Sequence, residues 1–494
     1  MARQGLLGQA KPAGTTNTLL YAAPIDSSAS TVLTVAADGG ADTYDVALKD
    51  YDQRLTLDAS TYKLHEGDVV TGYRFNLGTN IPAASALTAG QALTSADGEK
   101  KAIFESFYIE PFTTIYVQEL GIRSVTVNSV VGTFAVGETV TKGSGGNTAT
   151  ATIYGVAQGS GTTSIYIGPT TLAGSGTEFT DSDGITASGG ATASISTGGV
   201  GAAVNEFILS TDDVTYNLYL GVDLTVFTDR TYRFDVSDSS MSGIDFKLST
   251  TVNGEWGPDN IAGSADDGAE LTTGKTTNGT PGQAGAYIQY DFSAGALSGN
   301  LYFYEGDTGT AGNFAYGGND RYLVTSTDFT YSGVYIYDKE GTWVDGTDTF
   351  EANGVAYTVQ TQTAGAYGYV RDLSGATLKV IKGKNSADFT TSSVFQDSPI
   401  LTTASRAAVG VSAVLLATTA ADAEMYLRKD NAISDDNTEE IKSLVIGPGQ
   451  RLIVESNGGN AAFNLVGFED ASSALTIRNF GSGVGNGGGS GGGS

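Results

Sequence analysis

The segment Arg230–Gly243, RTYRFDVSDSSMSG, contains the pattern that decides the fold class. In its first half, the aromatic residues Tyr232 and Phe234 alternate with charged residues. Successive side chains of a β-strand point to opposite faces, so this alternation predicts a strand with one buried face. The second half consists mainly of Ser, Asp and Gly, which favour turns. The segment therefore predicts a β-strand that ends at a surface turn.

The composition extends this prediction to the whole chain of 494 residues. Glycine accounts for 68 residues, about twice its average share, and charged residues make up 16%, below the usual ~25%. Tyr, Phe, Thr and Ser are frequent, and helix formers are scarce. Since 40% of the residues are hydrophobic, the chain can form buried cores. We therefore expect an all-β protein whose strands are joined by Gly- and Asn-rich turns.

The formal net charge of −28 is spread along the chain. Such a surface stays soluble and opposes association between strand edges. It also repels phosphate groups, so we expect no binding to nucleic acid. The chain has no cysteine and one histidine, His65, which excludes disulfides, thiolate zinc sites, iron–sulfur clusters and most transition-metal centres. We expect His65 to be an exposed residue of the turn KLHEGD.

No targeting or membrane segment is expected. The first residues, MARQGLLGQAKPAG, lack the apolar core of a secretory signal. The apolar run 407–421 is too short, and too rich in Ser, Thr and Gly, to cross a bilayer. We therefore expect a soluble protein that is not inserted in a membrane. It would leave a cell by lysis or inside an assembled particle.

Two pairs of segments share an order of elements, which suggests internal repeats. Asp42–Val70 and Glu424–Val454 each begin with a strand that opens on Tyr, cross an Asp-rich connection and reach a turn Gly. Gly132–Val156 and Asp348–Val370 each contain a Phe-bearing strand followed by alternating strands. The order predicts five modules, A–B–C–B′–A′. In this arrangement the chain runs out along an elongated body and returns, so that A and A′ lie together.

The predicted fold is a set of tandem small β-sandwich or β-barrel modules. We place the boundaries at the shifts in composition: 1–128 for A, 129–200 for the Gly/Thr-rich B, 201–335 for C, 336–400 for B′, 401–480 for A′, and 481–494 for a flexible Gly/Ser tail.

One loop concentrates side chains that suit a hard cation. The stretch Gly257–Glu270, GPDNIAGSADDGAE, is rich in glycine and does not have EF-hand spacing. Calcium requires several flexible oxygen ligands, which clustered Asp and Asn residues supply. A solvated acidic loop is the alternative interpretation. The residues that we predict as ligands of a structural calcium ion are Asp259, Asn260, Asp266, Asp267 and Glu270.

No catalytic motif is recognisable. A Ser–His–Asp triad would need a nucleophile near His65, and no nucleophile elbow is present. Glycoside hydrolysis needs only two carboxyl groups, but nothing in the sequence marks such a pair. Phosphate-binding loops and dinucleotide fingerprints are absent. We expect no enzyme and no cofactor besides calcium, for which Asp181 and Asp183 in FTDSDGI form a weaker second candidate.

The opening segment also carries a resemblance to a known family. Together with Phe246–Trp256, Leu271–Phe292 and Leu301–Asp307, it resembles a cupredoxin-like β-sandwich module of structural proteins from marine cyanophages. In that family the last strand leads into Cys, His and Met at copper-ligand spacing. Here it continues as EGDTGTAGNFAYGG, which lacks all three. Type-1 copper requires two His and a Cys thiolate, so the resemblance implies a module without copper.

The ends of the chain resemble the same proteins. Thr18–Ala37 is similar to their first strands, and Leu444–Ser456 with Phe463–Asp470 is similar to their closing hairpin. The resemblance covers most of 1–480. It implies a virion structural protein of T-even-like myoviruses that infect marine cyanobacteria, assembled in the host cytoplasm and released by lysis.

Among virion positions we expect a tail-associated appendage, such as a fibre, baseplate or tail-decoration protein. It would form a homo-oligomer, either a trimer or a ring, and would contact other virion proteins and host surface polysaccharide. The alternatives are a capsid decoration or head-fibre protein, a glycan-binding adhesin, and a self-assembling extracellular filament subunit.

Overall fold

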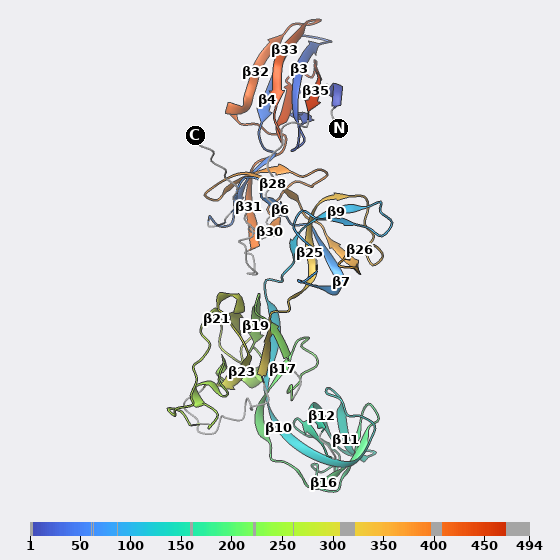
Figure 1. Ribbon diagram of the computed structural model, residues 1–494, viewed down its shortest axis with the longest axis vertical. Coiled ribbons are helices and arrows are strands. Elements are labelled where there is room, and N and C mark those ends of the chain that lie inside the picture. Colours follow the sequence, from blue (N-terminus) through green and yellow to red (C-terminus); the bar gives the residue numbers. More distant parts are fainter. Residues whose placement is uncertain are drawn as a thin grey trace, which may run out of the picture. The chain divides into compact units, whose positions relative to one another are not determined.

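The computed structural model describes residues 3–60, 62, 64–85, 87–158, 162–220, 224–259, 261–306, 322–396 and 408–470. The prediction of an all-β fold is confirmed, because these residues form β-strands in six sheets (Figure 1). Within the described ranges, helical structure is limited to four three-residue turns: η1 (Ser239–Met241), η2 (Gly254–Trp256), η3 (Phe292–Ala294) and η5 (Ala423–Met425). None of these turns has the length and apolar character that crossing a membrane requires.

The chain forms two compact units. The first contains the described residues within Met1–Ile109, Thr330–Thr402 and Arg406–Ser494. The second contains those within Glu110–Phe329.

A β-sandwich in the first unit combines the two ends of the chain. Figure 1 shows its C-terminal strands, coloured red and orange, alternating with its blue N-terminal strands. β3 pairs with both β33 and β35, although more than 400 residues separate them in sequence. One sheet has the order β1 (Arg3–Ala10), β35 (Ala461–Asp470), β3 (Ser28–Ala37) and β33 (Thr438–Ile446). The other has the order β2 (Thr18–Ala22), β34 (Arg451–Ser456), β4 (Asp42–Lys49) and β32 (Tyr426–Ile433).

The core between these two sheets follows from strict alternation. In β3 every second side chain is buried, including Leu33 and Val35, and in β35 the same holds for Phe463 and Leu465. Tyr44 of β4 meets Phe463 edge to face, with ring centroids 5.9 Å apart. Burial of large apolar side chains of this kind contributes about 1.5–3 kcal/mol each, which makes this core the main support of the sandwich.

Two further sheets belong to the first unit, and each mixes early and late segments of the chain. The first has its own core of buried residues around Leu55, Val370 and Val380. Its strand order is β30 (Val394–Gln396), β31 (Ala408–Leu416), β5 (Gln53–Leu57), β29 (Thr377–Lys382), β28 (Tyr367–Ser374) and β6 (Val69–Thr71). The second has the order β26 (Thr349–Ala352), β27 (Val355–Thr363), β7 (Arg74–Pro82), β25 (Thr330–Glu340), β9 (Lys101–Phe107) and β8 (Ala92–Thr94).

Buried charges link the sandwich to the neighbouring sheet. Arg451 of β34 makes a bidentate pair with Asp52, which also accepts a hydrogen bond from the Lys382 amide. Lys49, at the end of β4, is fully buried and donates to the carbonyl groups of Ala417, Thr418 and Ala420. Burial lowers the pKa of Lys49 to about 8. These side chains join segments that lie far apart in sequence.

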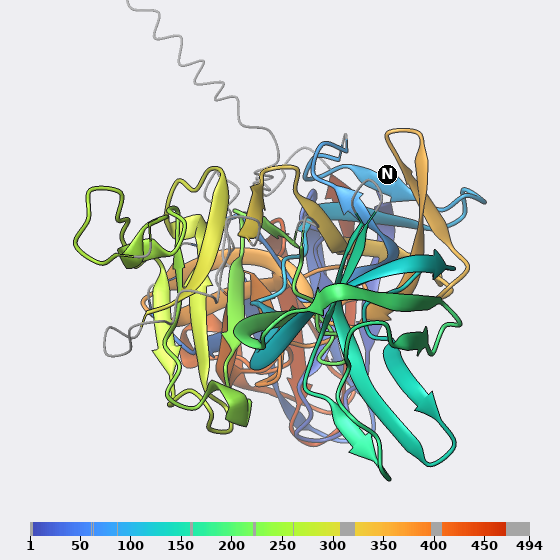
Figure 2. The ribbon, with the colours of Figure 1, turned by 90° about the horizontal axis from the view of Figure 1, so that it is seen from below.

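In the second unit, an extended sheet connects two cores. Its strand order is β13 (Thr163–Ile167), β12 (Asn147–Gln158), β11 (Thr139–Ser144), β15 (Gly184–Ala187), β16 (Thr192–Val200), β10 (Thr113–Val131), β19 (Thr231–Asp235), β22 (Tyr287–Asp291) and β21 (Lys275–Asn278). β14 (Thr171–Ala173) pairs with β12, and β17 (Val204–Ser210) pairs with β10. In Figure 2 the teal strands of this unit form a group apart from its yellow-green strands.

The yellow-green strands form a two-sheeted sandwich. Its second sheet has the order β18 (Leu224–Phe227), β24 (Tyr322–Ser326), β23 (Asn300–Glu305) and β20 (Phe246–Ser249). The core between the sheets contains stacked Phe246 and Phe303, with Phe207 edge-on to Phe246. The β-sandwich character of this segment is therefore confirmed, while its cupredoxin-like identity stays a prediction.

The segment RTYRFDVSDSSMSG forms the predicted strand. Tyr232 and Phe234 of β19 are buried in the sandwich core, and the intervening Arg233 is half-buried. The following turn is η1, which the Asp238 side chain caps by accepting a hydrogen bond from the Ser240 amide. Met241 in this turn is fully buried, so the turn closes one end of the core instead of lying wholly on the surface.

The predicted boundary at 128/129 falls inside β10. The first part of this 19-residue strand pairs with β17 and β19, and its last part pairs with β13 and β16. One continuous strand thus serves both cores of the second unit. The predicted boundary at 335/336 likewise falls inside a strand, β25 (Thr330–Glu340), and the remaining boundaries of the five-module division stay a prediction.

Candidate functional site

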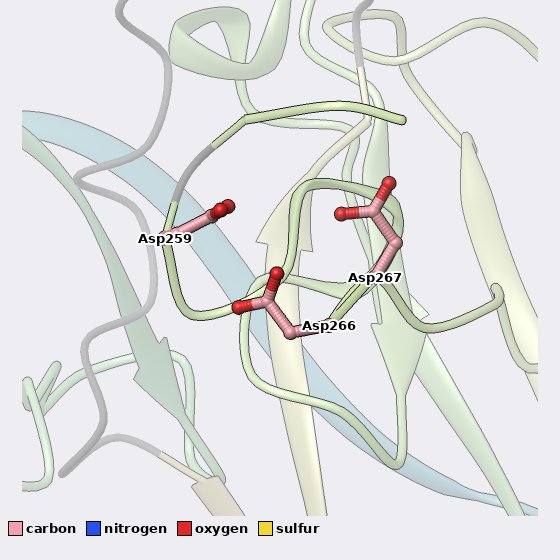
Figure 3. Close-up of side chains that lie close together, drawn as sticks. All are labelled: Asp259, Asp266 and Asp267. Atoms are coloured by element: carbon pink, nitrogen blue, oxygen red, sulfur yellow. The ribbon is translucent and has the colours of Figure 1, made fainter. Parts of the chain in front are cut away.

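The predicted cation loop brings three carboxylates together. Asp259, Asp266 and Asp267 each offer one oxygen, and these oxygens lie within 4.8 Å of one another. Figure 3 shows the carboxylates of Asp259 and Asp266 pointing toward the space that the loop encloses. The loop begins after η2, and an isolated β-bridge between Ser249 and Glu270 closes it. Within the described chain, the carboxylates belong to no ion pair with Lys or Arg.

The hydroxyl group of Ser264 occupies the centre of this cluster. Its oxygen lies 3.3 Å from an Asp259 oxygen and 3.0 Å from an Asp267 oxygen, and it also contacts Asp266. A hydroxyl group donates only one proton, so at least two of these contacts place oxygen against oxygen without a proton between them. The hydrogen bond from Ser264 lowers the pKa of Asp266, which favours its ionised form. The arrangement therefore concentrates negative charge that a bound cation would relieve.

Of the other two predicted ligands, Asn260 falls outside the described residues, and Glu270 lies beside two lysines. The carboxylate of Glu270 forms an ion pair with Lys275, and its second oxygen lies 3.9 Å from Lys247 Nζ. The bridge to Ser249 fixes Glu270 beside these lysines, so its charge is already compensated. The geometry thus groups three of the five predicted residues.

The weaker candidate around FTDSDGI has a different explanation. Asp183 accepts a hydrogen bond from the Thr180 amide and lies 2.6 Å from Lys142 Nζ. Asp181 accepts from the Gly198 amide at 2.7 Å. Each carboxylate therefore stabilises local backbone structure by accepting hydrogen bonds from backbone amides.

His65 and three large aromatic side chains are further candidates for parts of a site, and none of them forms one with the acidic loop. The His65 side chain is 60% exposed, which confirms the predicted exposed turn residue. Trp343, Phe303 and Tyr304 are buried, so their rings contribute to cores rather than to an exposed carbohydrate platform.

Calcium is expected to raise the thermal midpoint of EDTA-treated protein, because an ion that binds the folded state stabilises it by mass action. Each kcal/mol gained corresponds to a rise of about 2–4 °C for a unit of this size. The double variant Asp266→Asn, Asp267→Asn should lose this response, and Asp181→Asn should keep it. Equal midpoints of the wild-type protein in EDTA and in calcium would show that the cluster is a solvated acidic loop.

A second feature is an exposed apolar surface on the terminal sandwich. Leu6 of β1, Val466 and Phe468 of β35, and Val445 of β33 are between 47% and 60% exposed. Leu6 lies opposite Val466, which lies opposite the half-buried Val32 of β3. We call these five residues the apolar face.

On the two central strands, the residues around the apolar face are uncharged over 28–37 of β3 and 461–468 of β35, and the exposed Asp470 borders this area on the same side as Phe468. Ser30 of β3 pairs with Val445 of β33 on one side and with Phe468 of β35 on the other, so it lies between these two residues. The nearest charged side chains on β33, Glu440 and Lys442, pair with each other at 3.1 Å. On a chain with a net charge of −28, this neutral area is distinctive. The outward-facing residues of β3 and β35 that form this uncharged area are Ser30, Val32, Thr34, Ala36, Ala462, Asn464, Val466 and Phe468.

Sequence reasoning missed the apolar face, although a signal was present. The strand FNLVGF carries large apolar residues at both alternations: Phe463 and Leu465 point inward, and Val466 and Phe468 point outward. Such a strand is expected where both faces of a sheet are covered. Contiguous exposed apolar surface commonly marks an interaction site.

Comparison of the chain with protein-family models, with curated proteins and with solved structures finds no match.

Proposed function

We propose that the chain is a non-enzymatic structural protein of a tailed-bacteriophage virion. It acts as a tail-associated appendage, in a fibre, baseplate or tail decoration, and it assembles as a homo-oligomer. The apolar face carries this proposal, because an exposed sheet surface of this kind is suited to permanent contact with another subunit. The sequence resemblance to cyanophage virion proteins supplies the biological setting.

A second copy of the chain is the occupant that we propose for the apolar face. Two copies, each with a net charge of −28, repel each other over most of their surfaces. Contact between copies therefore favours an area with few carboxylates, which the outward positions of β3 and those of β35 up to Phe468 provide. Apolar and neutral residues also dominate the contacts of stable homo-oligomers. Homo-oligomers usually have closed symmetry, and we propose a trimer or a ring.

A capsid decoration or head-fibre protein would use the same contact, so location in the particle distinguishes these roles. We propose to image purified phage particles labelled with an antibody against the chain. Labelling of the tail, baseplate or fibres is the expected result, and labelling of the head would favour the decoration role. Particles that carry no label, while the same antibody detects the chain in the infected lysate, would contradict a place in the virion.

A further inference from the structure

A cavity in the first unit, lined by both polar and apolar groups, has no part in the proposed assembly. Its volume is about 880 Å³, within the range of small-molecule sites. It lies where the ends of β25 and β27 approach the loops that flank β29 and β30. Gly72 and Gly365 cross there with their backbones in contact, since a Cβ built on Gly365 would lie 2.4 Å from the carbonyl carbon of Gly72. Small residues at this crossing leave the cavity unfilled by side chains.

The cavity wall carries an ammonium group that forms no ion pair with the described residues. Lys339 Nζ donates to the hydroxyl oxygen of Tyr73 at 2.7 Å and lies 4.9 Å from the centre of that ring. The Tyr73 hydroxyl in turn donates to Gln362 at 3.1 Å, which fixes the ring. An ammonium group has three N–H donors, and Tyr73 accepts one of them. Within the described residues, no carboxylate pairs with Lys339.

The neighbouring charges are already compensated. Asp388, the acidic residue of the lining, forms an ion pair with Lys382 and accepts a hydrogen bond from the Thr418 hydroxyl at 3.1 Å. Lys384 pairs with Glu340 at 3.2 Å. Lys339 is therefore the charge that the cavity presents to a ligand, and its sign favours an anion.

The rest of the lining consists largely of hydroxyl groups. Thr342, Thr363, Ser386 and Ser393 border the cavity, and Val394 is the largest aliphatic side chain among them. Hydroxyl groups both donate and accept hydrogen bonds, so they match a ligand with many hydroxyl groups of its own.

We propose that this cavity binds an acidic saccharide. A uronic-acid carboxylate would meet the two remaining N–H donors of Lys339, and the sugar hydroxyls would exchange hydrogen bonds with the Thr and Ser side chains. This inference goes beyond the assembly role and does not depend on the apolar face, which belongs to a different sheet.

Titration calorimetry of the full chain with trigalacturonate tests the proposal, with neutral galactotriose and inorganic phosphate as comparison probes. Wild-type protein is expected to bind trigalacturonate. Lys339→Gln should weaken this binding about tenfold or more, because a charge-assisted hydrogen bond is lost. Lys339→Arg should bind within a few-fold of wild type. The matched control Lys384→Gln removes an equal charge from an exposed, paired lysine and should leave the affinity unchanged.

Three results would overturn the proposal. The first is no heat of binding for trigalacturonate at about 10 mM, where even weak saccharide sites are occupied. The second is equal affinity of Lys339→Gln and wild type, with unaltered thermal midpoints. The third is phosphate binding as tight as that of trigalacturonate, which would indicate a simple anion site. None of these results bears on self-association, so failure here leaves the assembly proposal standing.

Discussion

Replacing Arg451 with Ala is expected to lower the free energy of unfolding of the first unit by about 3–5 kcal/mol, since it breaks a buried ion pair by removing one partner. Arg451 donates to both oxygens of Asp52, at 2.8 and 2.7 Å, and to the carbonyl oxygens of Ala23 and Gly449. The two charged side chains are 8% and 3% exposed. Among the described residues, the substitution leaves the buried Asp52 carboxylate with one hydrogen-bond donor, the Lys382 amide.

Urea denaturation monitored by tryptophan fluorescence and circular dichroism measures this loss. Lys384→Ala is the control, because Lys384 and its partner Glu340 belong to the same unit and are 74% and 54% exposed. Exposed pairs of this kind contribute about 0–1 kcal/mol. If Arg451→Ala and Lys384→Ala destabilised the protein equally, the buried pair would not be the link between the sandwich and its neighbouring sheet.

Replacing Phe468 with Asp is expected to weaken self-association by at least about 100-fold. The substitution places a charge at the centre of an apolar contact, where an unpaired buried carboxylate is strongly unfavourable. Phe468 points away from the sandwich core and is 47% exposed, so the fold and its thermal midpoint should change little. Val214→Asp is the control, because Val214 is also apolar and is 81% exposed, but it lies in the second unit.

The contrast between these two variants is informative in both directions. If Phe468→Asp and Val214→Asp shift the mass distribution equally, general surface charge governs association and the apolar face does not. If Phe468→Asp also lowers the thermal midpoint by many degrees, the residue supports the sandwich itself.

Local patterns in the sequence were sufficient to predict the strands. The alternation of Tyr232 and Phe234 predicted β19, and the alternation of Thr and Ala in TATATIYGV matches β12. Strand partners were harder to predict, because pairing depends on matches between distant segments. Nothing near Ser28–Ala37 indicates that this strand pairs with two strands at the other end of the chain. The junction between the two cores of the second unit was also not predicted, because the single continuous strand β10 takes part in both.

The same holds for the candidate site: residues that are close in sequence could be grouped, but their partners from distant segments could not be predicted. Asp259, Asp266 and Asp267 come together because one short loop carries all three. Glu270 is in the same loop, but lysines from β20 and β21 engage it, and loop composition does not reveal them. The cavity at Lys339 combines segments from four parts of the chain, so no single stretch of sequence marks it.

Sedimentation velocity of the wild-type protein tests the central claim most directly, since it measures whether copies of the chain associate. A single chain has a mass of 50.7 kDa. We predict a homogeneous species with a mass of a small multiple of this value at micromolar concentration, which dissociates to single chains when Phe468 is replaced by Asp. A wild-type protein that sediments as single chains at every concentration would contradict assembly through the apolar face.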